Sequence, residues 1–210
     1  MFTTNTPATL LRSLSALALI ATALQAQAAD YHAVINTSGM TGSAALDFQF
    51  NPGPLPAVGA SVTLSNFSGL LGNVISIDGD VSGALPGSVV LSNSSGYNDL
   101  FQSVTLGGSF SFDISFSGDF RSTSGNVGSS FAVGLLGGKT LSQYLGNSGS
   151  DLFQIDLMPK NGALPASIRL TQLDSSISSV TAAVPEPSSY LLMLGGLVAL
   201  GAVARRRRIG

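Results

Sequence analysis

The stretch from Ser109 to Ser117 constrains the fold more than any other, because its nine residues alternate between polar and apolar side chains without interruption. Successive side chains of a β-strand point to opposite faces, so this pattern predicts a strand with one face buried and one face in solvent. The buried side would carry Phe110, Phe112, Ile114 and Phe116. We therefore expect this strand to lie at the centre of the core.

Shorter strands are predicted on both sides of this stretch, separated by turns rich in Gly, Pro, Asn and Asp. The turn at Asp78-Gly79 favours a hairpin between residues 74–77 and a strand that restarts at Val81. The only rival helix, residues 139–145, is short. The whole pattern predicts an all-β protein, an antiparallel β-sandwich of jelly-roll or Greek-key type. The other expected strands cover residues 46–50, 61–65, 89–91, 131–136, 153–157 and 168–171, with a last one ending near Thr181.

Composition excludes several classes of protein. Charged residues make up only 10% of the chain, which argues against a charged helical bundle. The central part is mildly acidic and has no basic patch, so we expect no nucleic-acid partner. The absence of cysteine excludes disulfides, thiolate metal sites and a cysteine nucleophile. We expect no cofactor.

Residues 1–28 have the three parts of a secretory signal peptide. Arg12 gives a positive start, an apolar helical stretch covers residues 14–24, and Ala26 and Ala28 form a small-residue cleavage site. An uncleaved N-terminal anchor is the alternative, but the apolar run is short for a membrane span. The sequence therefore predicts export, followed by a β-rich domain over residues 29–183.

The tail, residues 184–210, also has three parts. Pro185, Glu186 and Pro187 form an extended and exposed segment, because each proline fixes φ and lacks a backbone donor. A charge-free run over residues 188–204 would span about 25 Å as a helix, near the lower limit for crossing a membrane. Four arginines at the end would hold the C-terminus in the cytoplasm. The predicted anchor uses Tyr190, Leu191, Leu192, Leu194, Leu197, Val198 and Leu200, and the topology signal is Arg205, Arg206, Arg207 and Arg208.

This order of parts resembles the tail of the bacterial PEP-CTERM sorting proteins, which have a Pro-Glu-Pro motif, a hydrophobic segment and a basic cluster. The resemblance implies that an exosortase recognises the tail, cuts near Pro-Glu-Pro and transfers the protein from a transient inner-membrane anchor to the cell surface or matrix. An ordinary tail anchor that contains two prolines is the alternative. The central segments LDFQFNPG and GSFSFDISFSGD look like the β-rich ectodomain of one PEP-CTERM group, which implies an architecture but no chemistry.

Few residues of the central domain indicate chemistry. His32 is the only histidine, and it lies too close to the expected new N-terminus for a well-positioned general base, so a place on a strand face is the better interpretation. Asp78 and Asp80 on a tight loop are a weak candidate for calcium, joined in space by Asp99, Asp113 and Asp119, although turn chemistry alone explains them. The glycine-rich segment 134–140 does not match the spacing of a phosphate loop, so we expect a turn there.

Three functions remain open. The first is a structural component of the cell surface or biofilm matrix. The second is a module that binds carbohydrate, an exopolysaccharide in particular, which would need Tyr97 or Tyr144 exposed beside an Asp. The third is an enzyme, and it has the least support because the domain has one His, no Cys and no Glu. We therefore expect a non-enzymatic protein.

Overall fold

The computed structural model of the chain describes residues 30–183. The expected signal peptide, with its helix and its cleavage residues Ala26 and Ala28, lies outside the described residues. So do the Pro-Glu-Pro motif, the predicted membrane helix and the four arginines of the tail. Among residues 30–183, no helix is long and apolar enough to cross a membrane.

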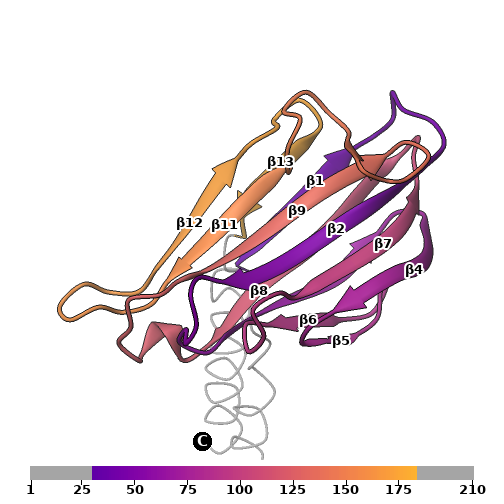
Figure 1. Ribbon diagram of the computed structural model, residues 1–210. Helices are drawn as coiled ribbons and strands as arrows, with labels where there is room; N and C mark the ends of the chain where they lie inside the picture. The colour runs from indigo at the N-terminus through magenta and orange to yellow at the C-terminus, as the bar shows by residue number, and fades with distance from the viewer. Residues whose placement is uncertain (1–29, 184–210) are drawn as a thin grey trace, which may run out of the picture.

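The described chain forms two antiparallel sheets, as the sequence predicted (Figure 1). Sheet A has the order β13 (Ser178–Ala182), β1 (Tyr31–Asn36), β8 (Ser109–Gly118), β3 (Ala60–Ser68), β6 (Val89–Ser92), β5 (Val81–Gly83). Sheet B has the order β12 (Ser167–Gln172), β11 (Phe153–Met158), β9 (Ser129–Gly137), β2 (Ser43–Pro52), β7 (Asp99–Thr105), β4 (Leu71–Asp78), and β10 (Gln143–Tyr144) pairs with β9.

The strands are nested in pairs that fold back on one another. β1 pairs with β8 and β3 with β6 in sheet A, while β2 pairs with β7 in sheet B. All three pairings are antiparallel. The chain therefore passes repeatedly between the two sheets, and strands distant in sequence become neighbours.

The core lies between the sheets and is built from phenylalanines. On β8 the burial alternates as the sequence predicted, with Phe110, Phe112, Ile114 and Phe116 all buried. Phe112 meets Phe48 of sheet B edge to face, with ring centroids 5.3 Å apart. Such pairs add about 0.5–1.5 kcal/mol beyond the burial of their area. The strand chosen from periodicity is thus the inner strand against which sheet B packs.

The strands expected from the sequence are all present, but three were missed, namely β1, β7 and the two-residue β10. The sequence predicted no strand at β1, which lies beside the expected cleavage point, or at β7. In β7 the alternation is broken by Gln102, which is buried because its Nε2 donates to the backbone oxygens of Gly72 and Ser103 at 2.9 and 3.1 Å. The short 3₁₀ helix Asp119–Arg121 was also not foreseen, and segment 139–145 is a turn followed by β10.

The prediction of a hairpin at Asp78-Gly79 is wrong. β4 pairs with β7 in sheet B, whereas β5 pairs with β6 in sheet A, so the turn crosses from one sheet to the other. The turn is fixed from outside, since the Asp80 N–H donates to Asn98 Oδ1 at 2.8 Å. Gly79 has a φ of 72°, and a Cβ there would lie 2.0 Å from the Tyr97 carbonyl oxygen. Tertiary contacts, rather than local turn chemistry, direct the chain here.

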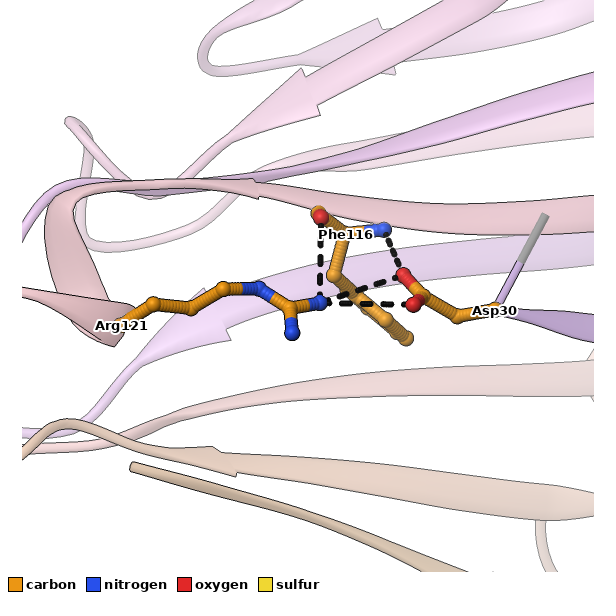
Figure 2. A network of polar contacts seen from close by, with 3 residues as sticks. All are labelled: Asp30, Phe116 and Arg121. Atoms are coloured by element: carbon orange, nitrogen blue, oxygen red, sulfur yellow. Dashed lines mark hydrogen bonds and ion pairs between the residues drawn. The ribbon is translucent and has the colours of Figure 1, made fainter. Parts of the chain in front are cut away.

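The start of the domain is held by one charged network (Figure 2). The Asp30 carboxylate accepts a hydrogen bond from the Phe116 N–H at 2.6 Å, and it forms an ion pair with Arg121 at 3.3 Å. The Arg121 guanidinium also lies 5.2 Å from the centre of the Phe120 ring. The network ties the first described residue to the end of β8 and to the 3₁₀ helix.

Candidate functional site

The outer face of sheet B carries a row of polar side chains on β2. Asp47, Gln49 and Asn51 point away from the core, alternating with Leu46, Phe48 and Phe50. The Gln49 Nε2 donates to Asp47 Oδ2 at 2.7 Å, and the Asn51 Nδ2 donates to Gln49 Oε1 at 3.4 Å. The row is therefore held in fixed geometry by its own hydrogen bonds.

Asp99 of β7 joins this row beside Asp47. It pairs with Gln49 across the two strands, and only 6% of Asp99 and 8% of Asp47 are exposed. The Oδ1 atoms of both aspartates have no hydrogen-bond partner within residues 30–183. Burial, followed by the adjacent Asp47 and the charge of Asp78, raises the pKa of Asp99 to about 8. Asp99 therefore holds a proton at neutral pH, which lets the two carboxyl groups lie close together.

Two exposed tyrosines flank the carboxyl pair. Tyr97 is 49% exposed and Tyr144 is 38% exposed. Burial of part of the ring, and then the charges of Asp99 and Asp47, raise the pKa of Tyr97. Burial, and then Asp151, raise the pKa of Tyr144, with a further contribution from Asp47. Both rings therefore lie within the electrostatic reach of Asp47. Tyr97 comes just before β7, and Tyr144 belongs to β10.

Gly134 allows the segment after β9 to lie over the sheet. This residue pairs with Asp47, and a Cβ on it would lie 3.0 Å from Asp151 Oδ1 and 3.2 Å from a ring carbon of Tyr144. The Oδ1 of Asp151 also lacks a hydrogen-bond partner in the described chain. Burial raises the pKa of Asp151, while contact with Tyr144 opposes that shift. We call Asp47, Asp99, Asp151, Tyr97 and Tyr144 the Asp–Tyr cluster.

A groove continues the same face toward β12. Its volume is about 670 Å³, and its floor is a row of paired residues, in which Asn51 faces Ser130, Ser130 faces Asp156 and Asp156 faces Arg169. Asn51 lies four positions beyond Asp47 on β2, about 13 Å along the strand. The groove is lined by Asn51, Pro52, Gly53, Gly128, Ser129, Ser130, Asp156, Met158, Ser167 and Arg169.

The chemistry of this face is hydrogen bonding next to aromatic surface. The Oδ1 atoms of Asp47, Asp99 and Asp151 are buried and have no hydrogen-bond partner within residues 30–183, while Asp156 in the groove accepts a hydrogen bond from Gln154 at 2.6 Å. A tyrosine ring offers an apolar face with a polar edge. Buried polar atoms that lack a partner usually mark a functional position or an absent ligand. The face is therefore equipped to hold a neutral ligand rich in hydroxyl groups.

His32 lies on the opposite side of the sandwich, on the outer face of sheet A. It lies on a strand face, as predicted. The argument that a position near the N-terminus would leave His32 poorly held was wrong, because β1 lies between β8 and β13 in sheet A. Its Nδ1 lies 2.6 Å from Asp113 Oδ1, and Asn66 donates to Asp113 Oδ2 at 2.7 Å. Burial opposes ionisation of Asp113, but these contacts outweigh it and lower its pKa. Within the described chain, no hydroxyl group is hydrogen-bonded to the imidazole of His32, because the Thr181 hydroxyl donates to the backbone oxygen of this residue instead.

The fold separates some of the aspartates that were predicted as a weak calcium site. Asp78 pairs with Asp99, while Asp80 accepts a hydrogen bond from Ser94 Oγ at 2.5 Å. Asp113 lies on sheet A beside His32, so it does not join them. No group of three or more His, Cys, Asp or Glu within residues 30–183 is placed to hold a metal ion. Of the aspartates expected to join Asp78 and Asp80, Asp99 therefore lies beside Asp78 and Asp113 does not, and calcium binding stays a prediction.

The sequence pointed to part of this site. It named Tyr97 and Tyr144 as the exposed tyrosines that a carbohydrate site would need, and it placed Asp47 on the polar side of its strand. It missed the proximity of Asp99 and Asp151 to Asp47, because these residues lie on separate strands and loops. The sorting residues Pro185, Glu186 and Pro187 lie outside the described residues.

Comparison with known protein families identifies a PEP-CTERM protein-sorting motif at residues 183–208. No curated protein matches the chain, and no solved structure matches it. The chain therefore carries the sorting motif of exported proteins whose C-terminal anchor is cleaved off, with an exosortase as the processing partner. The resemblance seen in the tail is confirmed.

Proposed function

We propose that this protein is a non-enzymatic component of the cell surface or biofilm matrix that binds exopolysaccharide through the outer face of sheet B. The observation that carries the proposal is that Tyr97 and Tyr144 are both exposed and both lie within the electrostatic reach of Asp47. A sugar ring has an apolar face and a rim of hydroxyl groups, so it can contact a tyrosine ring while it donates to a carboxylate.

The groove supports an extended ligand rather than a single sugar. It adds Ser130, Asp156 and Arg169 to the same face, so a chain of several sugar units could contact both ends. The polar side chains are already oriented by one another, as with Gln154 and Asp156, which lowers the entropy lost on binding. The predicted location also suits such a ligand, because exosortase substrates resemble partners of an exopolysaccharide matrix.

Binding without chemistry is the simpler interpretation of the carboxyl pair. Hydrolysis of a glycoside would require two carboxyl groups about 5–9.5 Å apart on either side of the bond that is cut. Asp47 and Asp99 instead belong to neighbouring strands and interact directly, which raises the pKa of Asp99. We therefore assign them to recognition of hydroxyl groups.

The test is retention of the exported protein on native exopolysaccharide from an exosortase-bearing bacterium. We expect Tyr97→Ala and Tyr144→Ala each to weaken binding about tenfold, and Asp47→Asn to weaken it similarly, since one lost contact of 1.4 kcal/mol corresponds to that factor. Asp119→Asn is the matched control, because it removes the same charge from the 3₁₀ helix and should bind normally. Equal retention of all four variants, or none by the unmodified protein, would overturn the assignment.

A further inference from the structure

The two free edges of sheet B differ in chemistry. β4 forms one edge and β12 the other, at the right and left of Figure 1. On β4, Val74, Ile75 and Ile77 are 42%, 45% and 48% exposed. The strand contains no Lys, Arg or Pro, which are the residues that usually keep a sheet edge from pairing with another chain. The β4 edge is therefore open to an added strand.

We propose that β4 pairs with β12 of a second copy of this chain, so that sheet B continues from one molecule to the next. The six strands from β12 to β4 are antiparallel at every step. With an even number of strands, the two edges run in opposite directions, so a second molecule in the same orientation meets the first in antiparallel pairing. The contact joins unlike surfaces, and such contacts propagate into chains of molecules.

The side chains match when Asp78 lies opposite Arg169 of the second copy. Asp78 shares the outer face with Asp99, its partner on β7, and Arg169 shares it with Asp156, its partner on β11. The opposite charges would then meet on one face. No ion pair joins either residue to another within residues 30–183, so both charges are available for a partner.

The same register matches the apolar side. Ile77 then lies opposite Leu170 of the second copy. Both face inward, because their partners Leu100 and Ile155 belong to the core. Ile77 is 48% exposed and Leu170 is half-buried, so pairing would cover apolar area on both. The two bulges of β4 lie before Ser76, which leaves Ser76–Asp78 in regular register with β7 for this contact.

The arrangement leaves the faces of the sheets free. The outer faces of successive molecules would form one surface, on which the groove of one copy is followed by the Asp–Tyr cluster of the next. Self-association is nevertheless independent of the proposed function, because it needs no polysaccharide. A failure of carbohydrate binding would not affect the test that follows.

The absence of cysteine gives a direct test in the full-length chain purified in detergent. Ser76→Cys and Thr171→Cys, placed in one chain, would face each other between copies in this register, at a spacing that suits a disulfide. Within one molecule they are five strand spacings apart, about 24 Å, so only intermolecular bonds can form. We expect mild oxidation to give a ladder of dimers, trimers and larger species that a reductant collapses.

The matched control is the pair Ser38→Cys and Ser122→Cys, two exposed positions away from both edges. It should yield at most a tenth of the ladder. Adding Asp78→Arg to the first pair should suppress the ladder, and adding Arg169→Asp as well should restore it. Monomers from the first pair, an equal ladder from the control, or no effect of the charge exchange would each overturn the proposal; thermal melting verifies that each variant is folded.

Discussion

The backbone N–H of Ala183 donates a hydrogen bond to the carbonyl oxygen of Asp30 at 3.0 Å, so the last described residue of the domain is bonded to the first. β13 ends one residue earlier, at Ala182, which pairs with Tyr31. The sorting motif begins at residue 183. A cut near Pro185 would therefore remove no strand from the domain.

Asp30 should matter more for stability than Arg121. Asp30→Ala removes a charge-assisted bond to the Phe116 N–H, and we expect a loss of about 1–2 kcal/mol in the free energy of unfolding. Arg121→Ala removes a largely exposed ion pair and should cost less than about 1 kcal/mol. Urea unfolding of the two variants checks the order; equal losses would mean that the ion pair, which both variants remove, is the stronger contact.

The core depends on Phe112. Its ring lies 5.3 Å from that of Phe48 and is stacked on that of Phe67 at 6.0 Å. Phe112→Ala should lower the free energy of unfolding by about 3–5 kcal/mol, since it leaves a cavity between the sheets. Ser111→Ala, its neighbour on the outer face, is the control and should stay within about 0.5 kcal/mol. Chemical unfolding that gives similar losses for the two would contradict the packing described.

Stability should fall as pH rises from 5 to 8.5. The pKa of Asp99 is about 8 in the folded protein, against an ordinary value of 3.8 for an exposed aspartate, so between these values the folded state holds a proton that the unfolded state has lost. We expect the free energy of unfolding to decrease by about 1–3 kcal/mol over this range. The raised pKa of Asp151 acts in the same direction.

The matched variant is Asp99→Asn, which keeps a neutral side chain of the same shape at every pH. In this variant, most of the decrease in stability between pH 5 and 8.5 should disappear, as measured by melting temperature across the pH series. Asp113 and Asp174 have lowered pKa values, so the stability that they contribute is constant in this window and is lost only at lower pH. A decline that is unchanged in Asp99→Asn would mean that Asp99 is ionised in the folded protein.

The crossing turn at Gly79 should tolerate no side chain. Gly79→Ala would place a Cβ 2.0 Å from the Tyr97 carbonyl oxygen at a φ of 72°, and we expect a loss of about 1–3 kcal/mol in the free energy of unfolding. Gly39→Ala, where a Cβ meets nothing within 4 Å, should be neutral. Because the clash lies at Tyr97, the variant should also weaken binding to exopolysaccharide. A Gly79→Ala variant as stable as the unmodified protein would contradict the described turn between β4 and β5.

The sorting motif should control the size and location of the mature protein. Replacing Pro185, Glu186 and Pro187 by alanine should leave the chain unprocessed in an exosortase-bearing host, because the Pro-Glu-Pro part of the sorting motif is lost. Immunoblots of membrane and surface fractions would show the larger form retained in the membrane. A mature protein of unaltered size in the surface fraction would contradict the role of the motif.

Much of the fold could be predicted from the sequence, because a strand reveals its two faces through residues two positions apart. The alternation of residues 109–117 identified the central strand, and the turns delimited the others. β7 was hidden, since Gln102 points inward and its burial depends on the Gly72 carbonyl 30 positions away. The hairpin at Asp78-Gly79 failed for the same reason, because Asn98 and Tyr97 hold that turn.

By itself, the sequence determined the class of fold, the inner strand and the sorting address, since each of these is a local pattern that a short segment carries complete. Only the tertiary structure decided that Asp47, Asp99 and Asp151 meet between Tyr97 and Tyr144. Those residues come from separate strands and loops, and the nesting of β2 with β7 and β9 brings them to one face. Periodicity fixes which side of a strand a residue occupies, whereas pairing between distant strands fixes its neighbours.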